Sequence, residues 1–223
     1  MKYIIITLFA LAVLINGHSQ TKILLRPEMD KLFPESVQQA LGFKSQIRLV
    51  YSFADKNGSY YLPICESFDG MKEDDSSHWK IRGVNLRYEN GQFVKLWEMN
   101  DHILTTQYEE SIWFYTKYVT IKDLDGDGEV DPVMVYGSSA ANGKSDGRLK
   151  ILIYYKGKKV AIRHQNSELD GERTTEVDKE FYELPERVQG FVRGLMKRLA
   201  GDGQVIYATR WEEKMGQKKT FIQ

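Results

Sequence analysis

The chain has 223 residues, and its 31 Lys and Arg residues balance its 31 Asp and Glu residues, so the formal net charge at neutral pH is zero. A chain of this length can form one sizeable domain or two small ones, and its 42% hydrophobic content excludes a wholly disordered protein. The balanced charge excludes a general nucleic-acid binder, which would carry a basic excess. The single cysteine, Cys65, excludes an internal disulfide, and we interpret it as a buried apolar residue.

Residues 1–19 have the pattern of a secretory signal peptide. Lys2 precedes an apolar run over residues 4–15, and the small residues Gly17 and Ser19 occupy positions −3 and −1 of a cleavage site. The alternative is a membrane anchor or a buried strand, but the run falls short of the roughly 20 apolar residues that span a bilayer. We therefore predict an exported protein, in the periplasm, at the cell surface or secreted, whose mature chain has no transmembrane segment.

The next part of the chain predicts a short helix followed by pairs of strands. A proline near the start and a glycine just past the end indicate a helix over residues 34–42. Alternation of β-branched and aromatic residues with polar ones then indicates strands joined in hairpins. The predicted strand pairs are residues 47–53 with 59–64, 79–88 with 93–99, 112–121 with 130–136, and 148–155 with 160–164. The polar segment 69–77 is predicted to be a loop.

The C-terminal part predicts one long amphipathic helix. Apolar side chains with i, i+3, i+4 spacing mark residues 185–200, and Gly201 supplies a stop. The polar side of this helix is basic, which we interpret as a solvated face, with contact to an anionic surface as the alternative. Residues 204–209 are a candidate last strand, and the tail after Trp211 is predicted to be polar and mobile.

Together these elements predict one mainly β domain over residues 20–223, with α+β as the alternative class. We expect an antiparallel sheet or sandwich of about eight to nine strands, with a short N-terminal helix and one C-terminal amphipathic helix packed on it. The sequence has no internal repeat, so a complete β-propeller, which needs several similar units, is not expected.

Residues 123–131 carry the strongest chemical signal in the chain. Oxygen-bearing residues at alternate positions of a tight loop suit a hard cation that takes roughly six to eight oxygen ligands. The predicted ligands are the side chains of Asp123, Asp125, Asp127 and Asp131 and the backbone carbonyl of Glu129. Gly128 permits the sharp turn. The pattern predicts a structural Ca²⁺ site, since Mg²⁺ requires a stricter octahedral geometry. The alternative is an acidic surface turn that binds no metal.

The loop departs from the EF-hand pattern. An EF-hand loop has a bidentate Glu at its twelfth position, where this chain has Met134, and the flanking segments are strand-like rather than helical. The spacing Asp-x-Asp-Gly-Asp-Gly-x-x-Asp between strands resembles the calcium loops of FG-GAP and VCBS-type repeats of secreted and surface proteins. That resemblance implies as ligands Asp123, Asp125, Asp127 and Asp131. The chain has one copy, and Pro132 stands where an aliphatic residue is usual, so the resemblance does not imply a propeller.

A wider resemblance covers about residues 112–184. Residues 113–118, the acidic loop, residues 146–158 and residues 162–166 are similar to a family of exported bacterial proteins labelled surface polysaccharide (lipopolysaccharide) biosynthesis proteins. This resemblance implies the cell envelope as the biological context and surface glycan or lipopolysaccharide as a partner. It supplies no catalytic residues.

Weaker features bear on ligand binding. The aromatic residues of segment 112–121, Trp113 and Tyr115 among them, could stack on sugar rings, although such a row more often fills a core. The long polar loop 137–147 suits a binding loop, with a plain flexible connection as the alternative. His78, His102 and His164 do not have the spacing of metal ligands.

The sequence contains no recognised catalytic motif. Carboxylate pairs for glycoside hydrolysis converge only in space, and the candidates by residue type are Glu98, Asp101, Glu109 and Glu110. We favour a non-catalytic, calcium-binding protein of the cell envelope, linked to surface polysaccharide biosynthesis or glycan binding. The alternatives are a glycan-active enzyme with calcium as a structural cofactor and a protein–protein interaction module.

Overall fold

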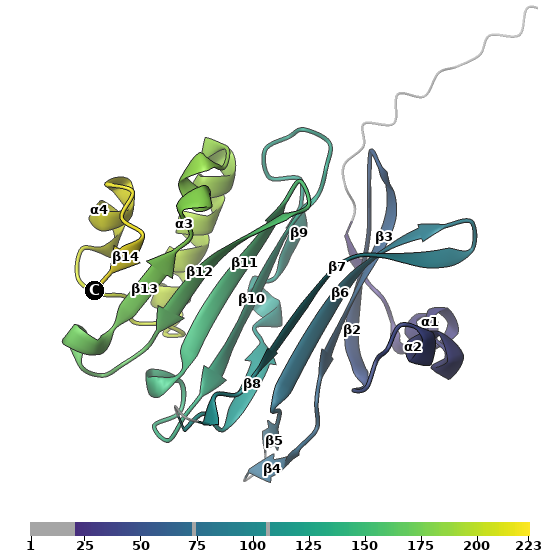
Figure 1. The fold of residues 1–223 in the computed structure, drawn as a ribbon, viewed down its shortest axis with the longest axis horizontal. Helices are drawn as coiled ribbons and strands as arrows, with labels where there is room; N and C mark the ends of the chain where they lie inside the picture. Colours follow the sequence, from purple (N-terminus) through teal and green to yellow (C-terminus); the bar gives the residue numbers. More distant parts are fainter. Residues whose placement is uncertain (1–20, 73–74, 106–107) are drawn as a thin grey trace, which may run out of the picture.

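The computed structural model describes residues 21–72, 75–105 and 108–223, and the predicted signal peptide, residues 1–19, lies outside these ranges. Two antiparallel sheets pack face to face, and helices cover the outer face of each sheet (Figure 1). The described chain is therefore mainly β, as the sequence predicts, and it forms a four-layer sandwich.

The N-terminal half of the chain forms the first sheet and its helical cover. In spatial order the strands are β1 (Lys22–Ile23), β2 (Ile47–Asp55), β3 (Gly58–Glu66), β6 (Lys80–Glu89) and β7 (Gln92–His102). Two helices, α1 (Arg26–Leu32) and α2 (Glu35–Ala40), cover the outer face. Between them Phe33 stacks on Phe93 of β7, with ring centroids 4.9 Å apart. The sequence predicts α2 but not α1, because α1 has seven residues and buries only Met29, which is too short for a periodic pattern.

The polar segment 69–77 is not a plain loop. It contains a small hairpin of β4 (Gly70–Lys72) and β5 (Asp75–Ser77), which extends from one end of the first sheet (Figure 1). The prediction of a loop was wrong here because backbone pairing needs no apolar side chains, so hydrophobic alternation does not reveal it.

The C-terminal half forms the second sheet. In spatial order its strands are β14 (Phe221–Ile222), β13 (Thr174–Val177), β12 (Lys158–Gln165), β11 (Arg148–Tyr155), β10 (Asp131–Ser139) and β8 (Ser111–Phe114), and β9 (Thr120–Lys122) also pairs with β10. The predicted long helix is α3 (Glu186–Gly201), which packs on the outer face. Short 3-10 helices are η2 (Thr116–Tyr118), η3 (Lys144–Asp146), η4 (Asp170–Glu172) and η5 (Lys179–Glu183).

Two predictions for this half need correction. Segment 112–121 is not one strand, because η2 divides it into β8 and β9, which pair with opposite ends of β10. The C-terminal tail is ordered: residues 204–209 form no strand, α4 (Trp211–Gly216) follows, and β14 pairs with β13. Met215 and Ile222 are fully buried, so burial of a few apolar residues fixes a tail whose average composition is polar.

Side chains alternate between two apolar layers along each central strand. On β10, Val133 and Val135 pack beneath α3, whereas Met134 and Tyr136 lie between the sheets. Neighbours cover both faces of β11. The sheets also meet where Trp97 stacks on Tyr154, with ring centroids 3.6 Å apart.

The acidic loop and a cleft lie at opposite ends of the strands β2 and β10. β2 ends at Asp55 beside the acidic loop, and β10 begins there with Asp131; the other ends of these strands, Ile47 and Ser139, line a cleft. Each of the two strands has nine residues, a length of roughly 26 Å at about 3.3 Å per residue. The acidic loop and the cleft are therefore separate sites.

Candidate metal centre and binding cleft

Three of the predicted metal ligands converge in the loop between β9 and β10. Asp123 directly follows β9, and Asp131 is the first residue of β10, so antiparallel pairing of the two strands brings the ends of the loop together. Asp123, Asp125 and Asp131 each offer one carboxylate oxygen, and these oxygens lie within 4.8 Å of one another. Oxygens bound at roughly 2.3–2.6 Å from a common Ca²⁺ have separations of this order. The three side chains could therefore hold a metal ion.

Two glycines give the loop its sharp turns. Gly126 and Gly128 have φ of +88° and +86°, a left-handed conformation that side chains disfavour. In this conformation the backbone amides of both glycines point toward Asp123. The Asp123 carboxylate accepts a hydrogen bond from the Gly126 amide at 2.7 Å and from the Gly128 amide at 2.9 Å. The backbone thus orients the first ligand before any ion binds.

Asp131 is the buried member of the group. Its residue is 1% exposed, and its carboxylate accepts a hydrogen bond from the Leu124 amide at 2.9 Å. Burial raises its pKa to about 7, and the neighbouring carboxylates of Asp125, Asp127 and Asp123 add to this effect. A buried carboxylate among other carboxylates is costly without a counter-charge. A cation bound here would supply that charge.

Asp127 and Glu129, the other two predicted ligands, have their side chains in ion pairs. The Asp127 carboxylate lies 2.8 Å from Lys156 Nζ, and the Glu129 carboxylate lies 3.1 Å from Lys56 Nζ. These lysines lower the pKa of both carboxyl groups. Asp127 therefore lies outside the converging group, and metal binding by the Glu129 carbonyl stays a prediction.

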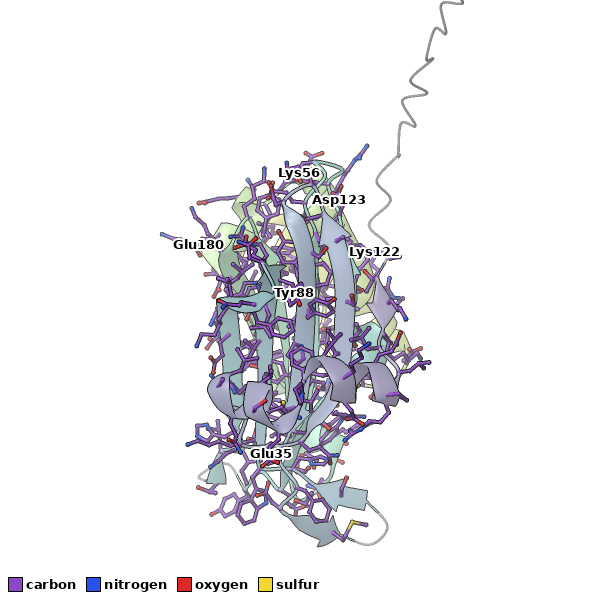
Figure 2. All side chains as sticks on the ribbon, turned by 90° about the vertical axis from the view of Figure 1, so that its right-hand side faces the viewer. Glu35, Lys56, Tyr88, Lys122, Asp123 and Glu180 are labelled. Carbon is purple, nitrogen blue, oxygen red and sulfur yellow. The ribbon has the colours of Figure 1, made fainter. Side chains whose placement is uncertain are left out.

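The loop is held by residues that sequence reasoning missed. Lys56 Nζ donates to the Asp127 carbonyl at 2.9 Å, Tyr155 donates to the Asp125 carboxylate at 2.9 Å, and Arg187 of α3 donates to the Asp125 carbonyl at 3.2 Å. Figure 2 shows Lys56 and Asp123 together at one end of the molecule. Because these partners come from distant parts of the chain, no local pattern could have revealed them.

A cleft of about 1120 Å³ lies at the other end of the sandwich. It lies where β2 begins and where β3, β5 and β10 end, and part of the predicted binding loop 137–147 lines it. Of the aromatic row, Trp113 lines the cleft, whereas Phe114, Tyr115 and Tyr118 are buried in the core. Phe68, which is 69% exposed, lines the cleft as well.

Polar groups inside the cleft form a connected set. Glu66 is almost buried and accepts hydrogen bonds from Arg48 and from the Phe114 amide. His78 donates from Nδ1 to the Ser67 carbonyl, so its Nε2 is left to accept from the Ser76 hydroxyl at 3.0 Å. The cleft therefore presents both charged and neutral hydrogen-bonding groups next to aromatic rings.

The four acidic residues proposed for catalysis do not all line the cleft. Glu98 bonds Arg82 and Lys95, which lower its pKa to about 2 with help from Asn100. Asp101 and Glu109 both bind the buried Arg148, at 2.8 and 2.6 Å. Glu110 lines the cleft. The structure thus places Glu98, Asp101 and Glu109 in ion pairs.

The histidines and the cysteine do not join the acidic cluster found in the described ranges. His164 is buried, with Nδ1 2.8 Å from the Thr175 hydroxyl and Nε2 3.0 Å from the side-chain oxygen Oδ1 of Asn166. Cys65 is buried as predicted, and burial raises the pKa of its thiol to about 12. It is therefore a protonated core residue at neutral pH.

Comparison of the chain with models of protein families, with curated proteins and with solved structures gave no match. Among the helices within residues 21–223 that the structure describes, none combines the length and the apolar character needed to cross a membrane.

Proposed function

We propose that the protein is an exported, calcium-binding protein of the cell envelope that binds surface glycan without transforming it. The observation that carries the calcium part is the convergence of carboxylate oxygens from Asp123, Asp125 and Asp131, with Asp131 buried. Carboxylates are the ligands that Ca²⁺ prefers, and extracellular calcium modules bind at roughly 10⁻⁴–10⁻³ M. The resemblance to exported polysaccharide proteins supports the location and the glycan.

Calcium in this loop would act on stability. The loop contacts the turn between β2 and β3 through Lys56 and contacts α3 through Arg187, so an ordered loop joins both sheets and a helix. At a calcium concentration about one hundred times Kd, binding stabilises the folded state by about 2.7 kcal/mol. That is a substantial part of the stability of a typical domain.

Thermal unfolding with and without calcium tests this part of the proposal. The wild type should melt at a higher temperature in calcium chloride than in chelator, and Asp125→Asn should melt equally in both. Asp170→Asn is the matched control, because Asp170 is an exposed acid that pairs with Arg173 away from the loop. Equal melting of the wild type in calcium and in chelator would refute calcium binding.

The cleft supports the glycan part of the proposal. Trp113 and Phe68 offer apolar ring surface, which packs against the faces of sugar rings. Hydroxyl groups of Ser76, Ser111 and Ser139 line the same space and can exchange hydrogen bonds with sugar hydroxyls. A volume of about 1120 Å³ exceeds the roughly 300–1,000 Å³ of typical small-molecule sites, as expected for an oligosaccharide.

An array of bacterial surface polysaccharides tests this part. Wild-type protein should bind at least one polysaccharide, and Trp113→Ala and Phe68→Ala should each reduce binding about tenfold, since aromatic contacts contribute on the order of 1–2 kcal/mol. Phe221→Ala is the control, because Phe221 is exposed on β14. Retained binding in both cleft variants would place the glycan elsewhere.

One contact favours the alternative, a glycan-active enzyme. The Ser76 hydroxyl lies 3.0 Å from His78 Nε2, an arrangement in which a histidine can accept the proton of a nucleophilic serine. Such a pair would cleave an acyl ester on a sugar: Ser76 adds to the carbonyl carbon, His78 takes the proton and passes it to the departing sugar alcohol, and water then releases the acid.

Hydrolysis of p-nitrophenyl acetate, with labelling by a fluorophosphonate, distinguishes the enzyme from the binding protein. An esterase should lose both signals in Ser76→Ala and keep them in Ser36→Ala, whose hydroxyl is exposed on α2. Equal signals from the wild type and Ser76→Ala would leave the non-catalytic proposal standing.

A further inference from the structure

Among the described residues, the lining of the cleft has a small excess of basic over acidic side chains. Arg26, Arg48 and Lys144 line it together with the acids Glu66 and Glu110, whereas the whole chain has 31 basic and 31 acidic residues. The Glu66 side chain is only 3% exposed, so its charge lies beneath the surface of the cleft. Glu66 offsets the charge of Arg48 but is itself out of reach of a ligand, and Arg26 also pairs with Asp30 at 3.0 Å. A ligand in the cleft therefore meets the cations of Arg48, Arg26 and Lys144 more directly than the Glu66 carboxylate.

Arg48 is held in a defined orientation by that buried acid. Its Nη1 binds both oxygens of Glu66, and the Phe114 amide binds one of the same oxygens at 2.8 Å. Arg48 nevertheless remains 47% exposed in its side chain, and a guanidinium has further N–H donors on Nε and Nη2. A guanidinium fixed on one side in this way is prepared to bind an oxyanion with little loss of side-chain entropy.

Lys144 places a second cation beside the aromatic wall. Its ammonium lies 6.0 Å from the ring centroid of Trp113 and 5.6 Å from that of Tyr115, and it donates to the Gln204 side chain at 3.0 Å. A sugar ring that packs against Trp113 would bring an acidic substituent close to this ammonium. The aromatic surface and the cation therefore act on one ligand.

From this arrangement we infer that the cleft selects saccharides that carry an oxyanion, a carboxylate or a phosphate, over neutral saccharides of the same size. The inference rests on the proposed glycan binding and adds the chemical class of the sugar. The serine hydroxyl groups distinguish the cleft from a simple polycation surface. They can form hydrogen bonds with the neutral hydroxyls of a sugar, while Arg48 and Lys144 can pair with its oxyanion.

Calorimetric titration with matched oligosaccharides tests the inference. The probes are oligogalacturonate, its methyl ester, which has the same backbone without the charge, and a phosphorylated oligomannose. Oligogalacturonate or the phosphorylated sugar should bind at least about tenfold more tightly than the ester, since a hydrogen bond to a charged group contributes roughly 1.5–3 kcal/mol. Whichever of the two binds more tightly identifies the oxyanion.

Two variants test whether the preference for charged saccharides arises in the cleft. Lys144→Gln and Arg26→Gln should each weaken binding of the charged sugar more than binding of the ester, and so reduce the preference. The control is Lys117→Gln, because Lys117 is exposed on η2 and pairs with Asp202. Arg48→Gln is less suitable alone, because it would leave the buried Glu66 without its partner.

The outcomes separate this inference from the proposed function. The inference would be overturned, and glycan binding would stand, if the ester bound as tightly as both oligogalacturonate and the phosphorylated sugar. Failure of all three saccharides to bind would overturn both. Equally tight binding of single-stranded DNA would show a general attraction to polyanions and would also overturn the inference.

Discussion

The Asp55 carboxylate accepts a hydrogen bond from the Val130 amide at 3.2 Å, although the two residues are 75 positions apart in the chain. Lys56, the next residue, donates from its backbone amide to the Gly128 carbonyl at 3.1 Å. These contacts join the turn of the first sheet to the acidic loop of the second. Any ion that orders the loop therefore also strengthens the association of the two sheets.

Asp131→Asn should have opposite effects in chelator and in calcium. In chelator at neutral pH, the variant should be at least as stable as the wild type, because it removes a buried carboxylate that lies among other carboxylates. In calcium chloride it should be less stable than the wild type, because a metal ligand is lost. Urea unfolding under both conditions measures the two differences. A large loss of stability in chelator would show that the carboxylate itself, without metal, stabilises the fold.

His164 should make the protein less stable below neutral pH. Burial lowers its pKa to about 4 in the folded protein, whereas an unfolded histidine has a pKa of about 6.5. The unfolded state therefore binds the proton first, and stability present above about pH 6.5 is lost as the pH falls toward 4, by at most about 1.4 kcal/mol per pH unit. Urea unfolding from pH 7.5 to 4.5 in saturating calcium measures this slope, and His164→Gln should flatten it. An unchanged slope in the variant would assign the loss to other groups.

Arg148 should be among the most important charged residues for stability. It is 8% exposed and binds the carboxylates of Asp101 and Glu109, and Glu109 also accepts from the Ser138 hydroxyl. Arg148→Met would leave the buried Glu109 without its counter-charge, whereas Asp101 would keep its ion pair with Lys150 at 2.8 Å. The free energy of unfolding should fall by about 3–5 kcal/mol. Arg163→Met, which removes a more exposed pair with Asp178, should cost at most about 1 kcal/mol. Similar losses in the two variants would contradict this reading of the buried cluster.

Calcium and glycan should bind independently while the protein remains folded. The acidic loop and the cleft lie at opposite ends of β2 and β10, so the ion cannot touch a sugar in the cleft. Distant, independent sites couple by less than about 0.5 kcal/mol, or roughly twofold in affinity. Calorimetry with calcium and with chelator, well below the melting temperature, checks this. A much larger calcium effect would indicate that the sugar binds at the metal loop.

Local patterns predicted much of the fold because hydrophobic periodicity reports on the immediate surroundings of each element. The hairpin β6–β7 follows from the turn at Asn90 and Gly91, and α3 follows from its apolar stripe. The pattern failed where pairing depends on the backbone alone, as in β4 and β5, and where a short element is stabilised by a distant neighbour, as in α4 and β14.

By itself the sequence determined which oxygens could surround an ion. The spacing of Asp123, Asp125 and Asp131, with glycines between them, places potential ligands in one turn because neighbours in a tight loop cannot move far apart. Only the tertiary structure decided that Asp127 pairs with Lys156 and that Asp131 is buried. It also decided where the cleft lies, because Arg48, His78, Trp113 and Lys144 come from separate segments that meet only when the two sheets pack. Such long-range contacts leave no trace in the local spacing of residues.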